Sequence, residues 1–93
     1  MSKTLSVLVL GSGFAGEGHV DAFRRAGAEV VGMVSRNKAV VEAVASKIGV
    51  PYACTDWAQA LADCKPDIVS IATPGGAHFE PVMAALEAGC HVY

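Results

Sequence analysis

Nearly continuous apolar runs constrain this chain more than any other feature of its sequence. Three of them, residues 5–10, 29–34 and 67–72, have the length and composition of strands that are covered on both faces. A shorter strand is expected at 52–54, near an edge of the sheet, because turn signals on both sides leave it little length. Residues 90–93 open a further strand. Strands buried on both faces belong to a parallel sheet, whose connections must cross over it.

The segments between these runs have the pattern of amphipathic helices. Apolar side chains recur at helical spacing in residues 15–26, 38–48 and 79–88, and a glycine directly follows each segment. Residues 57–63 follow Asp56, which resembles the first residue of a capping box. The order β-α-β-α-β-α-β-α-β therefore predicts an α/β fold of three layers, a parallel sheet with helices on both faces, connected by right-handed crossovers.

The length of 93 residues allows one domain, 1–93, and leaves no room for a second. In a doubly wound sheet of this kind the expected spatial order of the strands is 3-2-1-4-5. The sequence stops after the fifth strand, so we expect a sheet that is truncated there.

The first apolar run leads directly into Gly11-Ser-Gly-Phe-Ala-Gly16, which matches the pattern GxGxxG. In this setting Gly11 permits a tight turn, Gly13 admits a pyrophosphate close to the backbone, and Gly16 lets the helix pack on the strand. Phe14 and Ala15 complete the loop at the start of the helix, where free N–H groups face the phosphate charge. The motif predicts a Rossmann-type fold that binds a dinucleotide; the alternative is a strand-to-helix turn that holds no ligand.

The end of the second apolar run bears on the choice of dinucleotide. About 20 residues past the glycines, NAD-binding proteins usually carry an acidic residue for the ribose 2′-hydroxyl. This chain has Ser35 and Arg36 there, and Glu29 lies at the opposite end of the run. Ser35 can hydrogen-bond a 2′-phosphate and Arg36 can grip it or stack on the adenine, which favours NADP(H) over NAD(H). In the alternative reading, Arg36 and Lys38 are solvated residues ahead of a helix.

The loop after the run at 67–72 is the third candidate region, because it follows a strand beside the glycine loop at the point where ligands bind such sheets. We expect Thr73 and Pro74 to line the cofactor crevice. His78 either hydrogen-bonds the ribose or nicotinamide, or caps the following helix or faces solvent. His19 and His91 are expected to be packing or surface residues.

Charge and composition argue against several other classes of function. Seven Lys and Arg against nine Asp and Glu give a net charge of −2, which provides no basic field for nucleic acid or an anionic membrane. The apolar stretches are far shorter than the roughly 20 residues that span a bilayer. The three cysteines show neither CxxC spacing nor a nearby His pair, so we expect reduced, mostly buried thiols and no metal site. Reduced thiols agree with the cytoplasmic location that we expect for the chain.

With these residues in view, the chain resembles the cofactor domain of the glucose-fructose oxidoreductase, inositol dehydrogenase and MocA (Gfo/Idh/MocA) family. Three stretches carry the resemblance: residues 11–23, 30–36 and 67–93. The last is the most specific, since it combines a Thr-Pro turn, a His four residues after the Pro, and an Ala-Gly-x-His-Val approach to the next strand.

The resemblance implies an NAD(P)-binding domain of an oxidoreductase that acts on sugars or polyols. It implies that Thr73, Pro74 and His78 contact the cofactor, and Ser35 with Arg36 resembles members that accept NADP. Members continue into a Glu-Lys-Pro motif, whose lysine is commonly catalytic, and then into a substrate domain. This chain ends at Tyr93, before that motif, so no catalytic residue is assigned to it.

Two interpretations follow. In one, the chain is the cofactor-binding part of a larger NAD(P)-dependent oxidoreductase and is inactive alone; in the other, it is a stand-alone nucleotide-binding or assembly module without redox catalysis. The apolar final strand favours the first, because it leaves an unpaired sheet edge and uncovered helix faces. The same edge predicts self-association of the chain.

Overall fold

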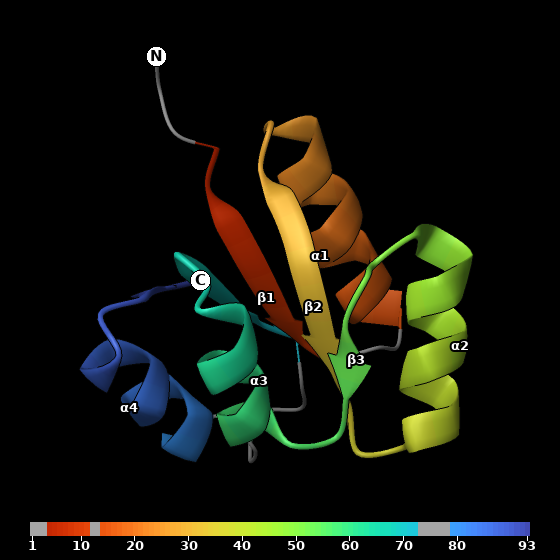
Figure 1. The fold of residues 1–93 in the computed structure, drawn as a ribbon. Coiled ribbons are helices and arrows are strands. Elements are labelled where there is room, and N and C mark those ends of the chain that lie inside the picture. The colour runs from red at the N-terminus through yellow and green to blue at the C-terminus, as the bar shows by residue number, and fades with distance from the viewer. Residues whose placement is uncertain (1–3, 12–13, 73–78) are drawn as a thin grey trace.

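The fold of the chain was obtained as a computed structural model, which describes residues 4–11, 14–72 and 79–93. The strands are β1 (Ser6–Leu10), β2 (Glu29–Val34), β3 (Ala53–Cys54), β4 (Ile68–Ile71) and β5 (His91–Val92). The helices are α1 (Phe14–Arg25), α2 (Lys38–Ile48), α3 (Trp57–Cys64) and α4 (Phe79–Glu87). Strands and helices alternate along the chain as predicted (Figure 1).

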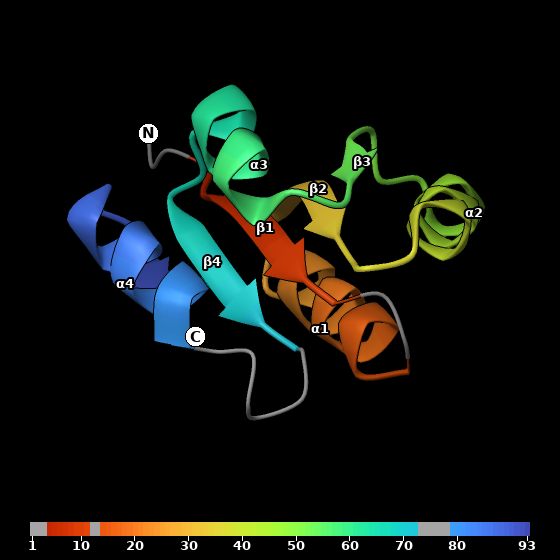
Figure 2. The ribbon, with the colours of Figure 1, turned by 90° about the horizontal axis from the view of Figure 1, so that it is seen from below.

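All five strands form one parallel sheet in the order β3-β2-β1-β4-β5, which confirms the predicted topology. Helices α1 and α2 cover one face of the sheet, while α3 and α4 cover the other (Figures 1 and 2). The edge strands β3 and β5 are two residues each, and β1, at the centre, pairs with β2 and β4.

The alternation of side chains along β1 explains its unbroken apolar sequence. Val7 and Val9 are fully buried under α1 and α2, and Leu8 and Leu10 pack on the opposite face under α3 and α4. Because successive side chains of a strand point to opposite faces, a strand covered on both sides must be apolar at nearly every position. The sequence therefore specifies two cores, one on each side of the same strand.

Polar caps and left-handed residues set the ends of the helices. The Asn37 side chain accepts a hydrogen bond from Val40 N at the start of α2, and Gly49 ends α2 with φ of 73°. Asp56 Oδ1 accepts from two backbone N–H groups at the start of α3, as expected of an N-cap. The reciprocal half of the capping box is not seen, because the Gln59 side chain donates to Asp63. Lys65, with φ of 44°, ends α3.

Candidate functional site

The parallel register brings three chain segments together at the carboxyl ends of the central strands. Leu10, the last residue of β1, pairs with Val34 of β2 on one side and with Ile71 of β4 on the other. Gly11 therefore lies in one row with the residues that follow β2 and β4. The arrowheads of β1 and β4 point to the same edge of the sheet, where α1 begins (Figure 2).

Gly11 occupies the centre of this edge in a position that only glycine fits. Its N–H donates to Val34 O over 2.6 Å, so the turn begins while the chain is still bonded to β2. Its φ is +125°, and a Cβ built on it would lie 3.0 Å from the carbonyl C and O of Ala72. The backbone at the end of β1 is thus held against both neighbouring strands, in a conformation that favours glycine.

Helix α1 begins directly past the glycine loop, with Phe14, Ala15 and Gly16 in its first turn. The first four N–H groups of a helix have no partner within it and carry partial positive charge. This is the geometry expected of a phosphate-binding helix terminus. Gly13 lies outside the described residues.

Ser35 and Arg36 follow β2 at the same edge, one and two residues past Val34. The Ser35 N–H donates to Cys54 O of β3, and its Oγ accepts from Asn37 N at 3.5 Å, which folds the chain back into α2. Arg36 is exposed. Glu29 is exposed at the opposite end of β2, so the structure places it away from this edge. Thr73, Pro74 and His78, the third predicted group, lie outside the described residues.

Sequence reasoning missed a bridge between α1 and β4. His19 Nδ1 and Ser70 Oγ are 2.5 Å apart, and Ser70 is fully buried. His19 was expected only to pack or to face solvent, but it satisfies the buried hydroxyl and ties the helix after the glycine loop to the central sheet. The available signal was Ser70 itself, because a serine within a buried apolar run needs a hydrogen-bond partner.

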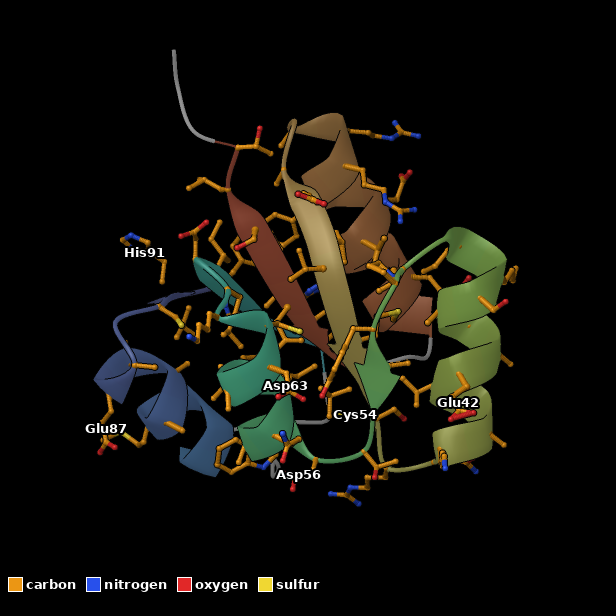
Figure 3. The ribbon with its side chains drawn as sticks, viewed as in Figure 1. Glu42, Cys54, Asp56, Asp63, Glu87 and His91 are labelled. Carbon is orange, nitrogen blue, oxygen red and sulfur yellow. The ribbon has the colours of Figure 1, made fainter. Side chains whose placement is uncertain are left out.

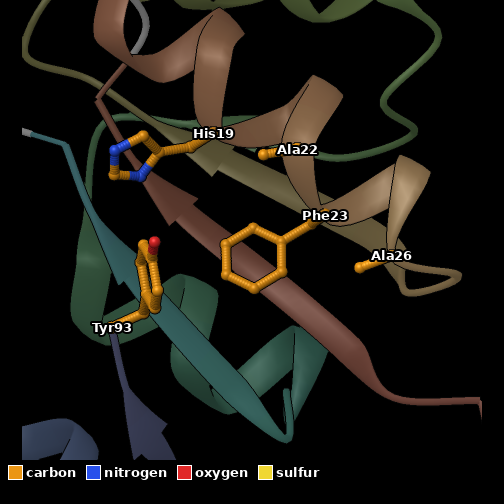
Figure 4. Close-up of a pocket in the computed structure, with 5 residues that line it drawn as sticks. All are labelled: His19, Ala22, Phe23, Ala26 and Tyr93. Atoms are coloured by element: carbon orange, nitrogen blue, oxygen red, sulfur yellow. The ribbon is translucent and has the colours of Figure 1, made fainter.

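A cavity of about 250 Å³ lies between α1 and the end of the chain (Figure 4). Its described lining is His19, Ala22, Phe23, Ala26 and Tyr93. The Tyr93 ring meets Phe23 and His19 edge to face, with centroids 5.3 and 5.9 Å apart, yet Tyr93 is 72% exposed. The five residues that line this cavity are all outside the predicted cofactor set.

A polar cluster near the β3 edge is separate from these groups. The Tyr52 hydroxyl donates to Asp63 Oδ2 over 2.7 Å, which raises the pKa of Tyr52 and lowers that of Asp63. Asp63 is one of the residues labelled in Figure 3. Burial raises the pKa of the Cys64 and Cys90 thiols.

All three cysteines are free, as expected, although only Cys90 is buried while Cys54 and Cys64 are partly buried. Within residues 4–11, 14–72 and 79–93, no group of three or more His, Cys, Asp or Glu is arranged to hold a metal ion. In the same part of the chain, no helix is long and apolar enough to cross a membrane.

Comparison with known proteins agrees with this geometry. Residues 5–93 match the Gfo/Idh/MocA sequence profile, described as an oxidoreductase family with an NAD-binding Rossmann fold. The chain is 35% identical to 4-carboxy-2-hydroxymuconate-6-semialdehyde dehydrogenase of Sphingobium sp. over 89 residues, which cover 95% of this chain and 28% of that relative.

Two solved structures extend the comparison to the fold. An NAD-binding oxidoreductase from Klebsiella pneumoniae has a TM-score of 0.88 and 35% identity, over 99% of this chain and 27% of that one. A scyllo-inositol dehydrogenase from Lactobacillus casei, with bound NAD(H) and scyllo-inositol, has a TM-score of 0.86 and 26% identity, over 97% of this chain and 27% of that one. The chain thus spans about a quarter of the length of these relatives.

Proposed function

Since this chain belongs to the Gfo/Idh/MocA family of oxidoreductases, as its NAD-binding Rossmann domain, we propose that it binds a nicotinamide dinucleotide across the carboxyl edge of its sheet. The observation that carries the proposal is the position of Gly11, with its N–H bonded to β2 and its Cα facing the backbone of Ala72 after β4. A side chain at this position would collide with that backbone, so glycine is what allows the chain to leave β1 here toward the first turn of α1, where the phosphates are proposed to bind.

The chain's own residues bind and orient the cofactor, which supplies the hydride chemistry when bound. Gly11 and Gly13 form the turn beneath the pyrophosphate. Phe14, Ala15 and Gly16 supply backbone N–H groups from the first turn of α1, whose dipole favours the negative charge. Binding at this edge holds the dinucleotide in one orientation, which is the contribution a protein makes to cofactor chemistry.

The ribose nearest the adenine is proposed to meet Ser35 and Arg36, with NADP(H) bound in preference to NAD(H). The support is the exposed Arg36 cation beside the Ser35 hydroxyl, with Glu29 at the far end of β2. Relatives use both cofactors: the Lactobacillus casei structure holds NAD(H), and a D-xylose 1-dehydrogenase of Haloferax volcanii, 39% identical over 64 residues, is named for NADP(+). A 2′-phosphate adds charge-assisted hydrogen bonds to an arginine, so the preference depends on Arg36.

The nicotinamide half is proposed to lie against the loop after β4, with Thr73 and Pro74 lining the crevice and His78 hydrogen-bonding the ribose or nicotinamide. The support is the Thr-Pro turn in the sequence, with His78 four residues after Pro74, together with the family membership. The catalytic lysine of the Glu-Lys-Pro motif and the domain that binds the substrate are proposed to lie in a further part of a longer enzyme that acts on a sugar or polyol.

Calorimetric titration of the folded chain with NADPH and, in parallel, with NADH tests the proposal. Saturable binding with NADPH preferred is expected, and Gly13→Val should abolish it because the new side chain occupies the pyrophosphate's approach. The matched control is Gly18→Val, since Gly18 is an exposed residue of α1 whose Cβ would meet nothing within 4 Å. Binding that is unchanged by Gly13→Val would place the dinucleotide elsewhere.

A second pair of variants tests the cofactor preference. Arg36→Ala should weaken NADPH binding and leave NADH binding nearly unchanged, whereas Arg25→Ala, at the far end of α1, should change neither. Equal losses for both cofactors on Arg36→Ala, or tighter binding of NADH by the wild-type chain, would contradict the preference for NADP(H).

We also propose that the isolated chain self-associates through β5 and is a cytoplasmic domain. The N–H of His91 donates to Asp67 O, just before β4, and the N–H of Tyr93, just after β5, donates to Val69 O, so the backbone N–H of Val92 points to the open edge. Exposed edges of this kind pair with other strands, and the 72% exposed Tyr93 lies beside this one. Analytical sedimentation at tens of micromolar should detect a dimer or a larger species, and a strictly monomeric chain would refute the association.

A further inference from the structure

We propose that Lys47 raises the affinity for the dinucleotide by neutralising Glu17 at the phosphate-binding end of α1, an inference that rests on the proposed function. Glu17 is the acidic residue of the first turn of α1, four residues into the helix that follows the glycine loop. Lys47 lies in the last turn of α2. Its Nζ is 3.3 Å from Glu17 Oε1.

The geometry gives Lys47 a role distinct from that of the other cation at this helix junction. Arg24 of α1 donates to the carbonyl oxygens of Ile48 and Gly49, which satisfies the carboxyl end of α2. The Lys47 ammonium is thereby left for the Glu17 carboxylate of the neighbouring helix. Glu17 is the more sheltered partner, with 36% of its side chain exposed against 71% for Lys47.

The Glu17 carboxylate stabilises the free helix but weakens the binding of a pyrophosphate. A carboxylate in the first turn stabilises a helix that holds no ligand, because it complements the positive helix end. When two phosphate charges approach the same end, the carboxylate repels them instead. Lys47 offsets that repulsion, so the approach of the phosphates to the first turn is no longer opposed by the Glu17 charge.

The expected magnitude is modest and depends strongly on salt. A unit charge about 10 Å from another in water changes an affinity roughly two-fold. For two phosphate charges with partial screening, we expect Lys47→Met to weaken NADPH binding about two- to three-fold at an ionic strength of about 0.01 M. At about 1 M, where the Debye length falls to roughly 3 Å, the difference should vanish.

The experiment is a double-mutant cycle on the whole chain, read by calorimetric titration with NADPH at low and high salt. Lys47→Met should lose affinity at low salt, and Glu17→Gln added to Lys47→Met should restore it. Arg25→Met is the matched control: it removes one cation from the Asp21–Arg25 pair, 3.0 Å apart, at the other end of α1, and should leave the affinity unchanged. Thermal unfolding of each variant checks that the fold is retained.

The outcomes separate this inference from the proposed function. If the wild-type chain binds NADPH but Lys47→Met binds equally well at low salt, the inference is overturned and the proposed function stands. A loss that persists at high salt, or that Glu17→Gln fails to reverse, would assign Lys47 a packing role and also overturn it. A folded wild-type chain that binds no dinucleotide would overturn both.

Discussion

Replacing Gly11 by alanine tests whether the backbone contact at the centre of the site is as close as the structure indicates. Two costs add at this position. The φ of +125° is one that L-residues rarely adopt, and holding a non-glycine residue in such a conformation costs about 1–3 kcal/mol. The new Cβ would also lie 3.0 Å from the carbonyl C and O of Ala72, backbone atoms that cannot rotate away. Overpacking of that kind costs about 1–3 kcal/mol.

The unfolded state offsets part of this loss, because alanine has less conformational freedom there than glycine, by about 0.4–1 kcal/mol. We therefore expect Gly11→Ala to lower the free energy of unfolding by about 1–6 kcal/mol. A domain of this size has about 5–14 kcal/mol in total, so the variant remains measurable by urea denaturation at a constant m-value.

The control is Gly89→Ala, which has a φ of +82° but whose Cβ would meet nothing within 4 Å. It carries the conformational cost without the contact, so it should lose less stability, by about 1–3 kcal/mol, than Gly11→Ala. If the two variants differed by less than about 0.5 kcal/mol, the contact between Gly11 and Ala72 would have no energetic consequence, and the argument that this contact excludes a side chain from Gly11 would be wrong.

Three further predictions concern the polar groups. Tyr52→Phe should flatten the pH dependence of stability at both ends, measured by urea midpoints at about pH 3, 7 and 10.5. At the acidic end, the lowered pKa of Asp63 gives stability that is lost as pH falls below about 4. At the basic end, the raised pKa of Tyr52 gives stability that is lost as pH rises above about 10. Asp56→Ala should cost about 1 kcal/mol in the same assay, because two N–H groups of α3 lose their acceptor, and Asp56→Asn should restore most of it. Ser70→Ala should cost about 1 kcal/mol and His19→Leu more, about 1–3 kcal/mol, because the second change strands a fully buried hydroxyl; equal losses would contradict this asymmetry.

The sequence was sufficient for the order of the sheet because β1, β2 and β4 are buried on both faces. Such strands leave no polar alternation that would allow an antiparallel assignment, and each is followed by a helix with a glycine at its end. The helix starts at Asn37 and Asp56 are local features, since a cap bonds to N–H groups only two or three residues away. Caps of this kind can be predicted from the sequence without knowledge of the fold.

The contacts between α1 and its neighbours were not predictable in the same way. His19 and Ser70 are 51 residues apart in the sequence, and Glu17 and Lys47 are 30 apart. A lone histidine or lysine on a helix is usually a packing or solvated residue, and only the crossover geometry shows which one meets a partner. The buried Ser70 was the one residue in these pairs whose environment alone required a partner.

The location of the proposed site follows from the direction in which the chain winds. From β1 the chain moves through α1 to β2 and β3 on one side, and from β4 it moves through α4 to β5 on the other, with the two helices on opposite faces of the sheet. In sheets of this kind, connections that leave two adjacent strands toward opposite faces create a crevice at the carboxyl edge, which is expected here above β1 and β4. Gly11 and Ala72 lie close together at this edge. On the proposed function, a dinucleotide bound there extends toward β2 at one end, and Ser35 and Arg36 are the side chains proposed to meet its ribose. Because Ser35 is only partly buried and Arg36 is exposed, selectivity between the two cofactors can change at these residues without any change in either core.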